Sequence, residues 1–241
     1  MPMPRMVITP RVPLGMTEAA PEALLRLLSW LSPSFPVGAF AYSHGIETAV
    51  DAGLIRGAAD LESWIGAVIT HGAGFADAVF LCHAWRAAAC GDGAGLQRVQ
   101  ACAAAFRGSA EAALESAAQG RAFVSALAAG WPDLAVRSEA GTEPAYPCVV
   151  GAAAGLGGIP LPDAVLAFLH AFATNLISAG VRLIPLGQRE GVRILAALAP
   201  VTARAAAAAL GTELDDLGTA TLRVDLTMAR HETQHVRLFR S

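Results

Sequence analysis

LPDAVLAFLHAFATNLISAGVRLIPLG, residues 161–187, is the stretch that decides the fold class. It is long and apolar enough to suggest a membrane span, but His170, Thr174, Asn175, Ser178 and Arg182 interrupt it. A helix that is apolar on most sides and carries polar groups at helical spacing is typical of the centre of a helical bundle. The stretch therefore predicts an all-α fold and no membrane span.

Helical spacing of apolar residues extends outward from this stretch in both directions. Leucines 24, 27, 28 and 31 line one face of a helix that Pro33 and Pro36 end, and residues 61–69 and 109–129 predict two more helices. TLRVDL, residues 221–226, alternates like a strand, but a single short strand has no pairing partner, so we expect helix or coil there. The sequence predicts a single-domain, all-α helical bundle of about ten helices.

The chain is expected to have three parts. Prolines at positions 2, 4, 10 and 13 interrupt the start, where an export signal needs an unbroken apolar stretch, so residues 1–20 are interpreted as a flexible N-terminal leader of a cytoplasmic protein. Residues 21–226 form the helical domain. Residues 227–241 form a C-terminal tail that binds a partner.

Composition excludes several classes of function. All 17 basic residues are arginine, so the chain cannot form a lysine Schiff base or a P-loop. A net charge of -3 argues against nucleic-acid binding. Hydrophobic residues make up 54% of the chain and charged residues only 15%, so we expect apolar surface to be covered in a homodimer or by a partner.

The C-terminal HETQH, residues 231–235, matches the zinc-binding pattern H-E-x-x-H. In that pattern a helix presents two histidine ligands, here His231 and His235, and Glu232 would be the general base. A zinc-dependent hydrolase is therefore the alternative function. No further ligand follows His235, and the motif lies near a terminus that we expect to fray, so a polar tail that contacts proteins is the favoured interpretation.

Four blocks of sequence resemble the UreF family of urease accessory proteins. They are SPSFPVGAFAYSHGIETAVDAGLI at 32–55, YPCVVGAAAGLGGIPL at 146–161, LHAFATNLISAGVRLIPLGQREG at 169–191 and RHETQHVRLFRS at 230–241. The structural residues of the first block are Pro33, Pro36, Gly38, Phe40, Ser43, Gly45 and Glu47. We interpret Ser43 as a helix N-cap, and leave open whether Phe40 and Val37 fill the core or contact a partner.

The resemblance implies a function without catalysis. Members of this family form an all-helical homodimer that binds UreD/UreH, and this pair recruits the GTPase UreG. The complex docks on urease apoprotein and supports nickel delivery. The resemblance therefore implies a scaffold with no catalytic residue, metal site or cofactor of its own, because the partners handle nickel and GTP.

The resemblance also points to the residues that bind partners. The set is Tyr42, Arg230, His231, Glu232, Gln234, Arg237, Leu238, Phe239 and Arg240. Within it, Leu238 and Phe239 would be apolar anchors and Arg237 would pair with a carboxylate of the partner. Because termini usually add little to a core, we expect removal of residues 230–241 to leave the fold intact. Many members carry tyrosine where this chain has His235.

Overall fold

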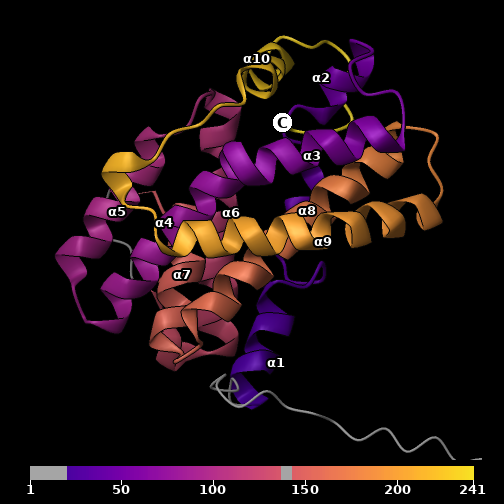
Figure 1. Ribbon diagram of the computed structural model, residues 1–241. Coiled ribbons are helices and arrows are strands. Elements are labelled where there is room, and N and C mark those ends of the chain that lie inside the picture. The colour runs from indigo at the N-terminus through magenta and orange to yellow at the C-terminus, as the bar shows by residue number, and fades with distance from the viewer. Residues whose placement is uncertain (1–20, 137–142) are drawn as a thin grey trace, which may run out of the picture.

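The structure is a computed structural model that describes residues 21–136 and 143–241. Across these ranges the chain is helical, with ten α-helices and three short 3-10 turns (Figure 1), which confirms the predicted all-α bundle of about ten helices. The elements are α1 (Pro21–Trp30), η1 (Ala39–Ala41), α2 (Ile46–Asp51), α3 (Ala58–His71), α4 (Ala73–Ala89), α5 (Gly93–Ala105), α6 (Ala110–Gly130), η2 (Pro132–Leu134), α7 (Tyr146–Leu156), α8 (Leu161–Leu183), α9 (Gln188–Leu210), η3 (Leu214–Asp216) and α10 (Leu222–His231).

Helix α4 lies at the centre of the bundle and contacts α3, α5, α7, α8 and α9. Its closest neighbour is α7, where two glycines allow the backbones to approach. A Cβ on Gly151 would lie 2.4 Å from the carbonyl oxygen of Leu81, and one on Gly155 would lie 2.6 Å from that of Trp85. Only glycine fits at such distances, so this pair of glycines sets the position of α7 against α4.

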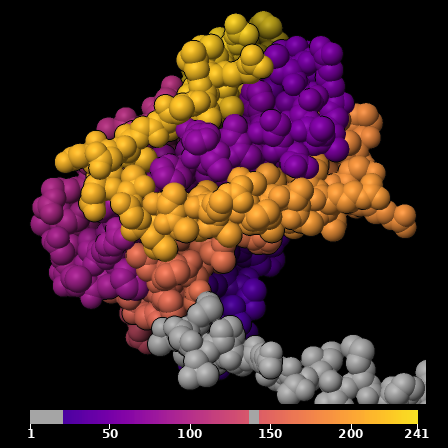
Figure 2. All heavy atoms as spheres, in the orientation of Figure 1, coloured from indigo at the N-terminus to yellow at the C-terminus, as the bar shows by residue number. Residues whose placement is uncertain are grey.

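Helices α8 and α9 are joined by a short turn and pack side by side. Helix α3 lies along α9 (Figure 2), and together these helices enclose an apolar core that includes Leu61, Ile65, Leu176 and Leu198. Isoleucine, leucine and valine at spacings of three and four provide the buried faces, as the periodicity predicted.

Three helical stretches are long and apolar enough to span a membrane when judged by length and composition, namely 58–89, 161–183 and 188–210. In the first of them Gly72 separates α3 from α4. Between 33% and 67% of the most apolar window in each stretch is buried inside the fold. Part of each stretch is therefore buried, with α8 and α3 each packed along α9.

The ends of the described chain bear on the predicted domain limits. The interpretation of residues 1–20 as a leader lies outside the described residues. Residues 222–231 form helix α10, which packs on α2 and α6 (Figure 1), so the expected limit at residue 226 falls inside a helix. Helix α1 ends at Trp30, before Pro33, but two leucines of its predicted apolar face, Leu24 and Leu28, are exposed.

We predict that Gly151→Ala lowers the free energy of unfolding by about 1–3 kcal/mol, because the new methyl group meets the Leu81 carbonyl group. Gly66→Ala is the matched control, since Gly66 also lies inside a helix but its Cβ would be 3.6 Å from Leu198. The control should be neutral or more stable by up to about 1 kcal/mol. Urea unfolding followed by circular dichroism measures both, and equal stabilities would contradict the close α4–α7 packing.

Candidate functional site

The loop between α1 and α2 has a backbone that requires glycine at two positions. Gly38 and Gly45 have φ values of 74° and 75°, in the left-handed region that favours glycine. A Cβ on Gly45 would also lie 2.7 Å from Oγ1 of Thr227 on α10. Gly38 is thus explained by the shape of this loop, and Gly45 by that shape together with its contact with α10.

Helix α8 holds the tip of this loop. The side-chain amide of Asn175 donates a hydrogen bond to the carbonyl oxygen of Ala39 at 2.9 Å, and the Arg182 guanidinium donates one to that of Phe40 at 2.8 Å. The Phe40 side chain is nevertheless 66% exposed, whereas Val37 packs against the core. Val37 is therefore partly buried against the core, as one of the two alternatives expected, whereas Phe40 does not fill the core.

His231, the last residue of α10, is buried between two carboxylates. Its Nδ1 lies 2.7 Å from Oε2 of Glu111 on α6, and its Nε2 lies 3.2 Å from Oε2 of Glu47 on α2. Glu111 also pairs with Arg237, and Glu47 accepts hydrogen bonds from the backbone amides of residues 238 and 239. The His231 imidazole therefore links α10 to α2 and α6, and the same two carboxylates link α2 and α6 to residues 237–239.

The residues after His231 form a segment, 232–241, that returns along α6 and α2. The Glu232 carboxylate accepts a hydrogen bond from the backbone amide of Ala110 at 2.8 Å, at the start of α6. Gln234 accepts one from the Thr48 hydroxyl at 2.8 Å and donates one to the Asp51 carboxylate at 2.6 Å. These contacts fix the first half of the segment.

The second half of the segment closes against the α1–α2 loop. Phe239 is buried beneath the Arg182 guanidinium, whose carbon lies 4.4 Å from the ring centre. The backbone amide of Arg240 donates a hydrogen bond to the Ala41 carbonyl oxygen at 2.8 Å. Arg182 also holds the loop tip, so one side chain of α8 stabilises both the loop and the segment.

Ser241 is 1% exposed and ends the segment inside the protein. The backbone amide and the hydroxyl of Ser43 both donate to its carbonyl oxygen, at 2.8 and 2.5 Å. The Ser241 hydroxyl donates to the carboxylate of Glu115 on α6 at 2.8 Å. Ser43 therefore anchors the segment, and the N-cap of α2 is Gly45 instead. The N-cap position expected for Ser43 was therefore wrong, but its hydroxyl does accept a hydrogen bond from the Glu47 backbone amide at 3.3 Å, in the first turn of α2.

The expectation that residues 230–241 add little to the fold is also wrong. His231, Phe239 and Ser241 are buried, and their neighbours are bonded to α2 and α6. Tyr42 is buried as well, so it and Phe239 pack within their own chain. Arg237 pairs with Glu111 of the same chain. The exposed side chains of the segment and of the end of α10 include Arg230, His235, Val236, Leu238 and Arg240.

The zinc interpretation of HETQH receives no support from the geometry. Helix α10 ends at His231, so His231 and His235 do not lie one helical turn apart. Both ring nitrogens of His231 contact carboxylates, and His235 is exposed. In the part of the chain that the structure describes, no group of three or more His, Cys, Asp or Glu side chains is arranged to hold a metal.

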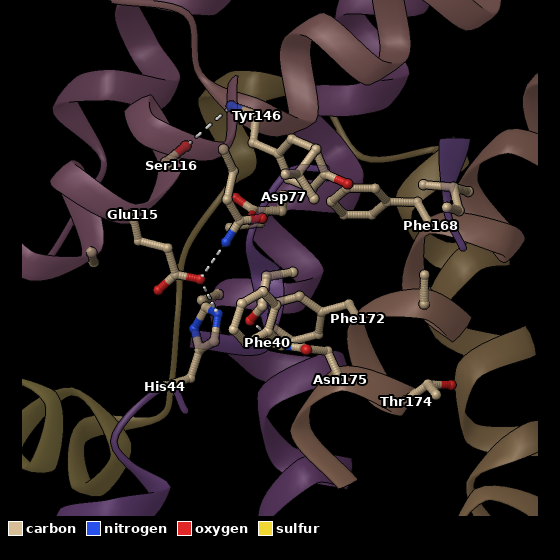
Figure 3. Close-up of a pocket in the computed structure, with 18 of the residues that line it drawn as sticks. Phe40, His44, Asp77, Glu115, Ser116, Tyr146, Phe168, Phe172, Thr174 and Asn175 are labelled. Carbon is tan, nitrogen blue, oxygen red and sulfur yellow. Dashed lines mark hydrogen bonds and ion pairs between the residues drawn. The ribbon is translucent and has the colours of Figure 1, made fainter. Parts of the chain in front are cut away.

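A cavity of about 500 Å³ lies between the α1–α2 loop, α4, α6 and α8 (Figure 3). Two ion pairs line it, with His44 Nε2 at 2.9 Å from Glu115 Oε1 and Arg107 Nη1 at 2.8 Å from Asp77 Oδ1. Aromatic rings of Tyr146, Phe168 and Phe172 form much of the remaining wall. These two ion pairs bring opposite charges together, but in the described part of the chain Nδ1 of His44 and Nε and Nη2 of Arg107 are buried without a hydrogen-bond partner.

Burial and charge pairing shift several pKa values at the cavity and in the core nearby. Burial raises the pKa of Asp77, and the Arg107 guanidinium opposes this shift. Burial alone would lower the pKa of His44, but the adjacent Glu115 carboxylate raises it above its usual value. Burial raises the pKa of Cys82 to about 11, so this thiol stays protonated at neutral pH and is a poor nucleophile.

Sequence reasoning missed the residues that hold the segment. Glu111 and Glu115 lie four positions apart in the alanine-rich stretch 109–129, so they share one face of α6. Two glutamates on one face of a helix that otherwise carries small residues could have indicated that this face pairs with buried polar groups of the same chain. Asn175 and Arg182 were noted only as interruptions of an apolar helix.

We predict that His44→Gln weakens the pH dependence of stability. The pKa of His44 is raised in the folded state, so its pairing with Glu115 stabilises the fold below the usual histidine pKa and is lost as pH rises through the folded value. The native chain should lose on the order of 1 kcal/mol more than the variant between pH 6 and pH 8.

Denaturant unfolding at the two pH values measures this difference. His170→Gln is the control, because His170 is an exposed histidine of α8 and should leave the native pH dependence unchanged. An unchanged pH dependence in His44→Gln would show that the His44–Glu115 pair does not titrate with folding.

Comparisons with other proteins identify the family. The sequence model of the UreF family matches residues 55–199, more than half of the chain. The chain is 54% identical over 222 residues to the urease accessory protein UreF of Rhodopseudomonas palustris strain TIE-1, covering 91% of this chain and 92% of that protein. Proteins with the same name from Bradyrhizobium sp. and Xanthobacter autotrophicus are each 50% identical, over 96% and 94% of this chain and 98% and 95% of their own. The chain belongs to the UreF family of urease accessory proteins.

Proposed function

We propose that this chain is a non-enzymatic scaffold for urease maturation. In this proposal it binds UreD/UreH, the pair recruits the GTPase UreG, and the complex supports nickel insertion into urease apoprotein. Family membership supports the general role. The observation that supports a docking role is the C-terminal segment, whose inner side is fixed to α2 and α6 while its outer side faces solvent.

The outer side of this segment is suited to a protein partner. Val236 and Leu238 are 84% and 65% exposed, and the Arg230 and Arg240 side chains also face solvent. Arginine is among the residue types that contribute most energy to interfaces, and the exposed valine and leucine provide apolar surface that a partner can cover. Because the backbone is already fixed, binding would cost little conformational entropy. We therefore assign UreD/UreH to this side of the segment, with carboxylates opposite the arginines.

A homodimer is the second part of the proposal. Two apolar stripes lie outside the segment, one on α1 with Leu24, Leu25 and Leu28, and one on α10 with Leu222 and Leu226. The leucines of α10 are one helical turn apart, and their side chains point away from the buried face that includes Val224 and Met228. A second copy of the chain would remove such stripes from water.

The proposal assigns the chemistry to the partners. The chain has no lysine for a P-loop, so nucleotide hydrolysis belongs to UreG, and nickel is cargo that the partners handle. We infer no cofactor for this chain. The net charge of -3 gives no support for nucleic-acid binding, and the mutual packing of the apolar helices supports a cytoplasmic protein outside the membrane.

We predict that Val236→Arg and Leu238→Arg each weaken binding to UreD/UreH by about tenfold or more, because an interface anchor is commonly worth 2 kcal/mol or more. Both side chains are largely exposed, so the fold should tolerate the change. Val192→Arg is the matched control, since Val192 is 67% exposed but lies at the start of α9.

Binding is measured by biolayer interferometry with immobilised UreD/UreH, followed by addition of UreG. The control should bind like the native chain. Native affinity in both segment variants would remove the segment from the proposed interface, as would an equal loss in the control.

We predict a dimer at micromolar concentration, and that Leu28→Arg or Leu222→Arg makes it monomeric, according to which stripe the second copy covers. Burying an unpaired arginine in an apolar interface costs more free energy than the leucine contact contributes to dimerisation, so dissociation should be complete at this concentration. Light scattering coupled to gel filtration measures the mass. A monomeric native chain, or two dimeric variants, would contradict the assignment.

A further inference from the structure

The cavity between the α1–α2 loop, α4, α6 and α8 is lined by residues whose buried nitrogens have no hydrogen-bond partner. In residues 21–136 and 143–241, five buried side-chain nitrogens lack such a partner. Four of them belong to residues that line this cavity, namely Nε1 of Trp30, Nδ1 of His44, and Nε and Nη2 of Arg107. A buried donor without an acceptor destabilises a fold, so four such nitrogens around one cavity are unusual for a protein interior.

The acidic groups of the cavity, by contrast, already face positive groups or donors. Glu115 accepts a hydrogen bond from Gln119 at 2.9 Å, and its Oε1 lies 2.9 Å from Nε2 of His44. Asp77 Oδ1 lies 2.8 Å from Nη1 of Arg107. Tryptophan and arginine N–H groups only donate. The unused hydrogen-bonding capacity of the cavity therefore suits a ligand group that only accepts.

Arg107 has the geometry that a carboxylate requires. Its Nη1 faces Asp77, which leaves Nε and Nη2, the two nitrogens along one edge of the guanidinium, without partners. Such an edge donates two parallel N–H groups to the two oxygens of a carboxylate, and this pairing is stronger and more specific than a single hydrogen bond. The side chain of Arg107 is only 10% exposed, so the pairing would be little weakened by water.

The rest of the wall is suited to an apolar body. The rings of Tyr146 and Phe168 lie 5.8 Å apart, and the Phe172 ring lies 4.8 Å from that of His44. Figure 3 shows His44 on one side of the cavity and the ring of Phe168 on the other. A cavity of about 500 Å³ with apolar walls and a few convergent polar groups has the size and character of a site for a small organic molecule.

Two further features fit a ligand site. Phe40 of the α1–α2 loop and His170 of α8 line the cavity and are exposed, so the cavity reaches the surface between these two elements. His44 has a φ of 51°, and among the non-glycine residues that the structure describes it alone has a positive φ. A side chain is held in this costly conformation where the surrounding structure imposes it, often at a binding site.

We infer that this cavity binds a small organic carboxylate with an apolar or aromatic body: the carboxylate pairs with the Nε–Nη2 edge of Arg107, and the body packs against Phe168 and Phe172. Both nitrogens are closed off from water in this structure, so the guanidinium turns towards the cavity when the ligand binds. Free donors cannot coordinate a cation, so a metal ion is not the expected ligand. The inference does not depend on the proposed partners.

Calorimetric titration of the full chain with phenylbutyrate tests the inference. The native chain should bind this acid saturably at millimolar concentration or below. Phenylbutyramide has the same shape without the charge, and it should bind about tenfold or more weakly, because an amide has a single oxygen to accept from the two N–H groups. Inorganic phosphate at the same concentration should not displace the acid. Displacement by phosphate would indicate an adventitious anion site only, and would overturn the inference.

The first variant is Arg107→Lys, which keeps a positive charge beside Asp77 but lacks the edge with two N–H groups. It should bind phenylbutyrate about tenfold or more weakly than the native chain. Arg121→Lys is the matched control, since Arg121 of α6 also pairs with a carboxylate, that of Glu143, and is half-exposed. The control should bind like the native chain. Thermal unfolding followed by circular dichroism checks that each variant is folded.

The second variant, Ala171→Phe, fills the cavity from α8 and leaves every charged group in place. It should bind no phenylbutyrate. If Arg107→Lys does not fold, this variant and the preference of the native chain for the acid over its amide decide the question. No saturable binding by the native chain would overturn the inference, as would equal binding of acid and amide. Native affinity in a folded Arg107→Lys or in Ala171→Phe would also overturn it.

Discussion

The pairing of buried charges between α2, α6 and the C-terminal segment is the interaction on which the surface features of this protein depend. Glu47 is a buried carboxylate and Glu111 a partly buried one, and such groups destabilise a fold unless donors surround them. Their donors come from His231, Arg237 and the backbone of the segment. The inner side of the segment therefore provides hydrogen-bond donors to the Glu47 and Glu111 carboxylates, while its outer side forms part of the protein surface.

The close packing of α7 on α4 provides the frame for this arrangement. Gly151 and Gly155 let the two backbones meet, and α6 and α8 then pack around this pair. From there α6 directs Glu111 and Glu115 towards the segment, and α8 directs Arg182 towards both the α1–α2 loop and Phe239. A scaffold of this kind can present a docking surface with little loss of entropy, because rigid helices hold it from beneath.

Sequence reasoning succeeded for the helices and the family and failed for the C-terminal segment. RHETQHVRLFRS combines arginines, histidines and a glutamate, a composition that is usually solvated at a terminus. The same composition also gave a zinc-like pattern. In the fold, half of these polar groups turn inward to partners on α2 and α6, and Phe239 fills a gap under Arg182. Local composition cannot distinguish the two outcomes, because it contains no information about distant partners.

The sequence by itself determined the helical elements and the family resemblance. Apolar spacing, the prolines after α1 and the glycines between α4 and α5 act within a few residues along the chain, so they can be read without a fold. Only the tertiary structure decided which polar residues are buried. His231 meets Glu111 and Glu47 across 120 and 184 residues of chain, and these contacts exist because helix packing brings α2, α6 and α10 together. Charge pairing over such separations depends on packing, which no local pattern records.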